Sequence, residues 1–180
     1  QMTTIKKLSS SVVYQNRWMT VREDQIERPS GAKGIYGVVE KPDFSIVIPV
    51  IGDTLVMVEQ FRYPLQKRYL EFPQGACEDQ PDIDPAELAR KELQEETGLI
   101  AKNLIHVGRQ ALAVGFCDQF YNIYLATEFD QGDINLDPEE EGLIKQEIKI
   151  SDFESMLQNG EIVDATSTTA YCLTKFKGLI

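Results

Sequence analysis

Residues 84–99 have the sequence DPAELARKELQEETGL, and this stretch decides how the rest of the chain is interpreted. Asp84 is a favoured helix N-cap, and Pro85 suits the first helical position because that position needs no N–H donor. Gly98 accepts the left-handed conformation that commonly ends a helix. The stretch therefore predicts a helix over residues 85–97.

One side of this helix is apolar and is bordered by acids. Because successive residues turn by about 100°, Ala89 and Leu93 share an apolar stripe. Glu92 and Glu96 lie beside that stripe, and Glu95 adds a third negative charge within one turn, so the carboxylates repel one another. Carboxylate oxygens are the ligands that Mg²⁺, Mn²⁺ and Ca²⁺ prefer. The pattern indicates a divalent-cation site, with a solvated acidic patch as the alternative.

The segments before this helix are rich in strand-forming residues. Three short runs of β-branched and aromatic residues predict an N-terminal antiparallel layer, at residues 12–14, 18–22 and 35–39. Residues 45–51 and 54–61 flank a short turn and predict a β-hairpin.

The segments after it alternate between strand and helix. Further strands are predicted at residues 104–111, 120–127 and 144–150. Ser151 and Glu154 have the spacing of a capping box, which predicts a helix over 152–159, and a last helix is predicted over 165–176. Strands, a helix and more strands around one core predict an α+β fold.

Composition narrows the possible functions. The 180-residue chain is long enough to bury a core, and its net charge of −11 argues against duplex nucleic acid as a partner. An acidic protein still binds an anionic substrate when a divalent cation lies between them. The three cysteines lack the spacing of a zinc site, and no apolar run approaches the roughly 18 residues of a membrane span. We expect a soluble, cytoplasmic protein with no membrane partner.

Two motifs next to the acidic helix resemble those of a known family. Gly75 followed by residues 91–99, KELQEETGL, resembles the Nudix box, which runs from a glycine to R-E-U-x-E-E-x-G-U, where U is aliphatic. The segments VEQFR at residues 58–62 and EFPQG at residues 71–75 are similar to the ADP-ribose and nucleotide-sugar pyrophosphatase branch of that family.

This resemblance has implications for fold and assembly. It implies a Nudix-type α/β/α sandwich with a mixed sheet and an N-terminal antiparallel strand layer. Residues 1–42 would form the N-terminal strands, and residues 43–180 would form the Nudix hydrolase domain. Members of the branch are commonly homodimers whose N-terminal strands exchange and complete the partner's pocket, so a homodimer is the expectation by analogy.

The sequence departs from the family pattern at three places. Ile83 stands where the motif has its first glutamate, and Cys77 stands at the glycine, so Gly75 implies two inserted residues in the loop. Lys91 replaces an arginine that orients a neighbouring glutamate, and lysine lacks the planar fork of arginine. Val114 occupies a position where many ADP-ribose hydrolases have proline.

The resemblance also implies a metal cofactor, Mg²⁺ with Mn²⁺ as a substitute, and residues that bind it. Glu92 and Glu96 would be the main ligands. Glu95 would be a third ligand or would hold a metal-bound water, which gives it a catalytic role. The backbone carbonyl of Gln74 would complete the set.

A general base is expected in the acidic loop at residues 137–142. Glu140 is the first choice and Glu141 the second, while a merely solubilising acidic turn is the alternative. Arg62 is a candidate for binding the pyrophosphate, because guanidinium presents forked donors to phosphate oxygens, or else it forms a surface ion pair. Glu71 is counted with Arg62 among the substrate-binding candidates.

Phe116 and Trp18 are candidates for stacking on a nucleobase, although aromatic residues of a sheet-rich domain are more often core. His106 is expected to be a packed or surface residue.

The predicted reaction is the metal-dependent hydrolysis of the pyrophosphate bond in a nucleoside diphosphate sugar, ADP-ribose first. The products would be a nucleoside monophosphate and a sugar phosphate. GDP-mannose, dinucleoside polyphosphates, coenzyme A and nucleoside triphosphates remain as alternative substrates. A module that senses nucleotides without hydrolysing them is the alternative of another class, and the intact Glu92, Glu95 and Glu96 argue against it.

Overall fold

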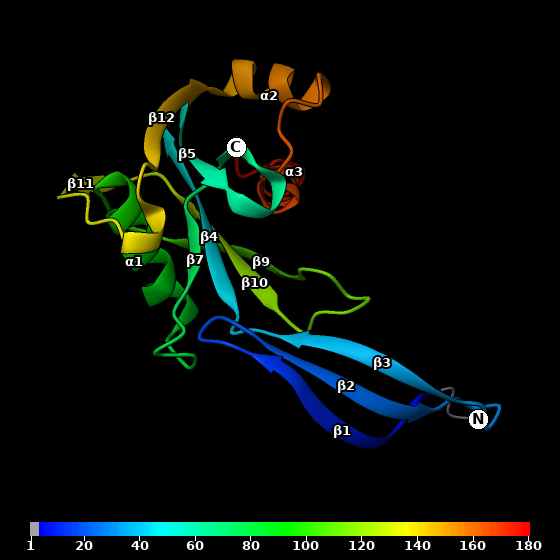
Figure 1. Cartoon of the computed structure of the whole chain (residues 1–180). Helices are drawn as coiled ribbons and strands as arrows, with labels where there is room; N and C mark the ends of the chain where they lie inside the picture. The colour runs from blue at the N-terminus through cyan, green and yellow to red at the C-terminus, as the bar shows by residue number, and fades with distance from the viewer. Residues whose placement is uncertain (1–3) are drawn as a thin grey trace. The chain divides into compact units, whose positions relative to one another are not determined.

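A computed structural model describes residues 4–180 of the chain (Figure 1). The chain divides into two compact units. The first contains the residues up to Asp43 together with Ala111–Phe120, and the second contains Phe44–Gln110 and Tyr121–Ile180.

The first unit is a three-stranded antiparallel sheet, as predicted for the N-terminal layer. Its strands, in the order β1-β2-β3, are β1 (Lys6–Gln15), β2 (Thr20–Glu27) and β3 (Lys33–Glu40). The predicted second strand starts too early. Trp18 belongs to a turn, because the Asn16 side chain accepts hydrogen bonds from the backbone N–H groups of Trp18 and Met19, both at 2.9 Å.

A segment distant in sequence contacts one edge of this sheet. The backbone N–H of Val39 donates to the Phe116 carbonyl at 2.7 Å, and the Asp118 N–H donates to the Val39 carbonyl at 3.1 Å. Residues 116–118 therefore form an isolated β-bridge with Val39 of β3, and they belong to the first unit.

The second unit contains a seven-stranded mixed sheet. The main path runs β12-β5-β4-β10-β9, with β6 paired to β5 and β7 paired to β4. The strands are β4 (Phe44–Ile51), β5 (Thr54–Arg62), β6 (Lys67–Glu71), β7 (Gln74–Ala76), β9 (Ile105–Ala111), β10 (Phe120–Ala126) and β12 (Ile144–Lys149). The pairing of β4 with β10 is parallel, whereas β4 with β5 is antiparallel, so the mixed α+β class predicted from the sequence is confirmed.

Helices cover both faces of this sheet. They are α1 (Pro85–Thr97), α2 (Ile150–Gln158) and α3 (Ala165–Phe176), and Figure 1 shows α1 on one side and the other two opposite. Successive side chains of a strand point to opposite faces. Accordingly, Val47 of β4 packs in the cluster that contains α1, whereas Ile46 and Ile48 pack with α2 and α3. This explains why β4 is almost continuously apolar.

Three of the predicted boundaries can be compared directly. The helices α1 and α3 have the bounds predicted from the sequence. The second predicted helix, over residues 152–159, is present, but it runs from Ile150 to Gln158. The predicted capping role of Ser151 was wrong, because Ser151 lies inside the first turn. The predicted strand before it consequently ends one residue earlier, at Lys149.

Several short elements were not predicted. They are the strands β6, β7, β8 (Leu99–Ala101) and β11 (Phe129–Gln131) and the 3-10 turns η1 (Tyr63–Leu65) and η2 (Pro138–Glu140). Three to five residues carry too little periodicity to be recognised. None of the helices in residues 4–180 combines the length and the hydropathy that a bilayer-spanning helix requires.

Candidate active site

The helix α1 is fixed at both ends and at one side. The Asp84 side chain accepts hydrogen bonds from the backbone N–H groups of Ala86 and Glu87, at 2.9 and 3.1 Å. Gly98 ends the helix at φ +74°, a conformation that favours glycine. The Ser45 hydroxyl on β4 donates to the Pro85 carbonyl at 2.8 Å, which anchors the first turn to the sheet.

Three carboxylates from two parts of the chain meet beside this helix. Glu92 and Glu96 come from α1, and Glu140 comes from the turn η2. One carboxylate oxygen from each of them lies within 4.8 Å of the other two. A capping interaction holds Glu140 in place. Its carboxylate accepts a hydrogen bond from the Asp137 backbone N–H at 2.9 Å.

Two of these carboxylates are buried. Glu92 is 4% exposed and Glu96 is 1% exposed, and neither carboxylate oxygen of Glu96 has a hydrogen-bond partner of standard geometry within residues 4–180. Burial raises the pKa of Glu92 to about 8, while the neighbouring Lys91 ammonium acts in the opposite direction. Burial also raises the pKa of Glu96 well above its ordinary value, and the negative charges of Glu140 and Glu92 add to the rise.

Glu95, the other candidate ligand on this helix, has a different environment. Lys91 Nζ lies 2.7 Å from Glu95 Oε2 and 3.8 Å from Glu92 Oε1. Lysine at this position therefore still contacts the neighbouring glutamates, although it lacks the forked geometry of arginine.

Gly75 of β7 lies directly against the acidic helix. A Cβ atom at Gly75 would stand 2.2 Å from Glu92 Oε2, which no side chain allows without displacing the carboxylate. Any larger residue at this position would therefore have to move the Glu92 carboxylate out of its place in the cluster.

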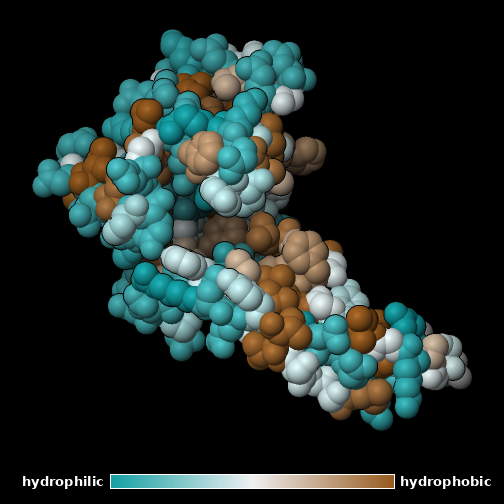
Figure 2. Space-filling view, viewed as in Figure 1, coloured by the Kyte–Doolittle hydropathy of each residue, from teal (hydrophilic) through white to brown (hydrophobic). Residues whose placement is uncertain are grey.

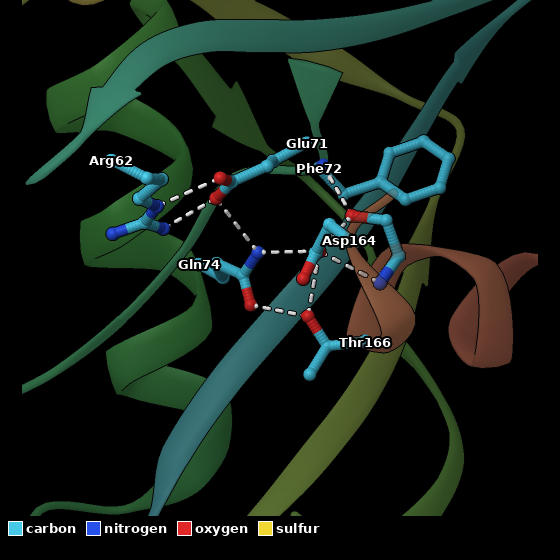
Figure 3. A network of polar contacts seen from close by, with 7 residues as sticks. Arg62, Glu71, Phe72, Gln74, Asp164 and Thr166 are labelled. Atoms are coloured by element: carbon cyan, nitrogen blue, oxygen red, sulfur yellow. Dashed lines mark hydrogen bonds and ion pairs between the residues drawn. The ribbon is translucent and has the colours of Figure 1, made fainter. Parts of the chain in front are cut away.

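A polar network continues from β5 through β6 and β7 to α3 (Figure 3). The Arg62 guanidinium donates to both carboxylate oxygens of Glu71, with Nε at 2.7 Å from Oε1. Burial raises the pKa of Glu71, and the hydrogen bonds from Arg62 counter that rise. The Gln74 amide nitrogen donates to Glu71 at 3.2 Å and to Asp164 at 3.0 Å.

The acidic cluster does not include Glu141, Phe116, Trp18 or His106. Glu141 is exposed on the loop that carries Glu140. Phe116 and Trp18 belong to the first unit and are 58% and 42% exposed, so a core position for either is wrong. His106 lies on β9, where its Nε2 is 3.3 Å from Asn122 Oδ1 and its ring packs on Tyr124, in line with the packed histidine expected.

Sequence reasoning missed two polar connections of this region. Asp164 is the N-cap of α3 and contacts Gln74, and its place before a predicted helix was an available signal. Arg68 donates to the carbonyls of Glu59 and Gly142, both at 2.9 Å, which ties β6 to the end of the Glu140 loop. No sequence pattern connects residues 74 positions apart.

The residues present fit a divalent cation. Buried carboxylate oxygens without hydrogen-bond donors need a positive partner, because leaving such a charge unpaired is costly. Glu96 supplies two such oxygens, and Glu92 and Glu140 add further oxygen donors of the kind that Mg²⁺ and Mn²⁺ prefer. The fold and the cluster together define an α+β protein with a group of carboxylates that could hold a divalent cation.

Comparisons with known proteins identify the family. The model of the NUDIX domain matches residues 41–166, and the model described as the nucleoside diphosphate sugar hydrolase N-terminal domain matches residues 5–39. The chain belongs to the NUDIX family, which confirms the resemblance seen in the sequence, and it is a Nudix hydrolase.

Individual relatives agree with this assignment. The chain is 26% identical over 170 residues to the ADP-ribose pyrophosphatase of Bacillus subtilis strain 168, covering 93% of this chain and 90% of that one. It is 31% identical over 122 residues to a methanol dehydrogenase activator of Bacillus methanolicus, covering 67% and 65% of the two chains. A crystal structure titled as an ADP compounds hydrolase has the same fold, with a TM-score of 0.85 at 20% identity and coverage of 100% and 99%.

Proposed function

We propose that this protein hydrolyses the pyrophosphate bond of nucleoside diphosphate sugars, with ADP-ribose as the first candidate substrate. Water adds to one phosphorus while the bond from that phosphorus to the bridging oxygen breaks, which yields a nucleoside monophosphate and a sugar phosphate. The buried, unpaired Glu96 carboxylate beside Glu92 and Glu140 is the observation that carries the proposal. The similarity to the ADP-ribose pyrophosphatase of Bacillus subtilis supports the choice of substrate.

The metal proposed for this site is Mg²⁺, with Mn²⁺ as a substitute. Glu92 and Glu96 would bind it, with Glu95 and the Gln74 carbonyl as further ligands. A divalent ion at such a site polarises phosphoryl oxygens and favours deprotonation of water.

Glu140 is the proposed general base. Burial raises the pKa of its carboxyl, and the negative charges of Asp137 and Glu95 raise it further, while the Asp137 backbone N–H and Lys91 act in the opposite direction. A carboxylate with a raised pKa accepts a proton from water more readily than an ordinary one. Glu141, exposed on the same loop, is the second candidate.

Arg62 is the proposed contact to the pyrophosphate, and Glu71 orients its guanidinium. The bidentate hydrogen bonds between them fix the plane of the guanidinium group, which preorganises it for binding phosphate oxygens. Phe116 and Trp18 are proposed to stack on the base, and their exposed rings leave them accessible to a ligand.

A substrate screen tests the proposed function. Purified protein would be incubated with Mg²⁺ or Mn²⁺ and with ADP-ribose, GDP-mannose, dinucleoside polyphosphates or coenzyme A, and the monophosphate product would be measured after phosphatase coupling. We expect ADP-ribose turnover that Glu96→Gln abolishes. Nucleotide-induced thermal stabilisation without turnover of any substrate would contradict the proposal and would identify a nucleotide sensor.

We also propose a homodimer built on the first unit. Several large side chains of its sheet are more than half exposed, among them Val12, Val13, Tyr14 and Ile35. Brown, hydrophobic residues are visible on the surface of this unit in Figure 2. Exposed apolar groups of this kind favour a subunit interface. Light scattering after size exclusion would test it, and a monomer at micromolar concentration would contradict it.

We propose a cytoplasmic location as well. Cys77, Cys117 and Cys172 are all free thiols, as expected in a reducing compartment.

A further inference from the structure

The segment of residues 71–75, which leads into β7, is held from the side by the first turn of α3. The Phe72 backbone N–H donates to the Ser167 hydroxyl at 2.8 Å. On the other side of Pro73, the Gln74 amide nitrogen donates to Asp164 at 3.0 Å. The N-terminus of α3 therefore forms hydrogen bonds with this segment on both sides of the proline.

The hydrogen-bond partners of the Gln74 side-chain amide determine which way the amide points. Its amide nitrogen faces two carboxylates, Glu71 and Asp164, which in their ionised form only accept hydrogen bonds. Its amide oxygen lies 2.8 Å from the Thr166 hydroxyl, which also lies 2.7 Å from Asp164. A hydroxyl has one proton, so it donates to one of these two acceptors at a time. Figure 3 shows the Gln74 amide between the two acids.

Asp164 is well suited to act as an anchor. Its carboxylate accepts from the Ser167 backbone N–H at 2.9 Å and from the Ser167 hydroxyl at 2.6 Å, so it caps α3 while it holds Gln74. The helix α3 packs into the core through Ala170 and Tyr171, which are 0% and 2% exposed. A displacement of Gln74 would therefore have to break contacts with a rigid element.

The backbone at Gln74 lies next to the acidic cluster. Gly75 approaches Glu92 so closely that even a methyl group would collide with its carboxylate. Glu96 lies one helical turn after Glu92 on α1 and belongs to the same cluster of carboxylates. The spacing between β7 and α1 thus determines where the carboxylates of Glu92 and Glu96 lie.

We propose that Asp164 is a positioning residue of the hydrolytic site, acting through the Gln74 side chain to hold β7 at the distance from α1 at which Glu92 and Glu96 bind a divalent cation together. The proposal rests on the proposed metal site. Residues that orient metal ligands typically change metal affinity or activity by about 10- to 100-fold when they are replaced.

The test measures Mn²⁺ binding in the absence of substrate, by electron paramagnetic resonance of free Mn²⁺, together with kcat and KM for ADP-ribose. Asp164→Ser retains a side-chain oxygen that caps a helix but is too short to reach Gln74. Gln74→Ala removes the other end of the contact and retains the backbone carbonyl. We expect each variant to weaken Mn²⁺ binding about 10- to 100-fold. Asp164→Asn, which keeps the length and an acceptor oxygen, restores most of the affinity.

The double variant Asp164→Ser with Gln74→Ala distinguishes a shared route from two separate effects. If Asp164 acts through Gln74, the Mn²⁺ affinity of the double variant equals, within about twofold, that of the single variant with the lower Mn²⁺ affinity. Multiplied effects, or wild-type Mn²⁺ affinity in Asp164→Ser, would overturn the proposal.

Two controls separate this proposal from its premises. Tyr171→Phe removes the hydrogen bond from α3 to Glu154 without touching Gln74, so its Mn²⁺ affinity stays at the wild-type value. A loss of affinity there would show that any loosening of α3 suffices, which contradicts a specific role of Asp164. Glu96→Gln tests the metal site itself: if that variant binds Mn²⁺ normally, the proposed site is wrong, whereas if only Asp164→Ser does so, the positioning role is wrong.

Discussion

At the residue scale, Glu96 combines nearly complete burial with two carboxylate oxygens that lack hydrogen-bond donors. Such a group destabilises a protein unless a cation or a proton neutralises it. The same residue is therefore expected to cost stability in the metal-free protein and to be needed for metal-dependent hydrolysis. These opposite requirements explain why a functional site is poorly optimised for folding.

Glu96→Gln is expected to abolish hydrolysis and to stabilise the metal-free protein. Removing an unpaired buried charge is worth about 1–3 kcal/mol, and each kcal/mol raises Tm by about 2–4 °C for a chain of this size. Thermal unfolding in EDTA at pH 8 measures the change. The matched control is Glu95→Gln, because Glu95 is partly exposed and paired with Lys91, so its replacement should change stability by no more than about 0.5 kcal/mol. A lower Tm for Glu96→Gln would contradict the prediction.

The pH dependence of stability follows from the same group of acids. Burial raises the pKa of Glu92 from 4.5 to about 8, and the pKa of Glu96 is raised as well. Between these values the folded protein binds more protons than the unfolded chain, so the free energy of unfolding decreases as the pH rises. We expect the Tm of the metal-free protein to fall steadily from pH 5 to pH 8. If the Tm in EDTA stayed constant or rose over this pH range, the pKa values of the two carboxyl groups would not be raised in the folded protein.

At the element scale, the helix α1 carries the candidate ligands and depends on its N-cap. Asp84 satisfies two backbone N–H groups of the first turn. Asp84→Ala is expected to cost about 0.5–2 kcal/mol, whereas Asp84→Asn retains an acceptor and costs less. Urea unfolding of both variants, compared at equal m-value, measures the difference. Equal stability of the two variants would mean that the cap contributes little and that packing of Leu93 and Ala89 holds the helix.

The elements also show where local sequence patterns succeed and where they fail. The bounds of α1 were predictable because a cap, a proline and a terminal glycine mark its ends locally. The capping-box pattern at Ser151 and Glu154 failed, since the pairing of β12 with β5 ends at Lys149 and Thr54 and the helix starts directly after it. A tertiary contact of the strand thus overrode a short-range signal.

At the scale of the whole molecule, metal binding is expected to be coupled to stability. A ligand that binds the folded state alone adds about 2.7 kcal/mol to the free energy of unfolding at a hundred times its dissociation constant. Saturating Mg²⁺ should therefore raise the Tm of the wild-type protein measurably, and more at pH 8 than at pH 6, because protons compete with the metal for the carboxylates. Thermal scans with a Mg²⁺ titration measure the shift.

The Glu96→Gln variant is the control for that titration. Its Tm should respond little to Mg²⁺, because one of the proposed ligands is gone. An equal Mg²⁺ response in both proteins would place the stabilising ion elsewhere.

The sequence by itself determined the family, the α+β class and the acidic helix. These features depend on local information: caps, helical periodicity, alternating strands and a motif whose residues lie within one helix. Glu92, Glu95 and Glu96 of α1 could be named as candidate ligands for the same reason.

Only the tertiary structure decided which distant residues join them. Glu140 approaches Glu92 and Glu96 across more than forty positions of sequence, and Asp164 reaches Gln74 across ninety. No periodicity or cap encodes such contacts. The turn that carries Glu140 precedes β12, which pairs with β5, whereas Gln74 and Asp164 meet because β7 pairs with β4 and α3 packs against the same sheet. Which of Glu92, Glu95 and Glu96 is buried without a partner depends on that packing too.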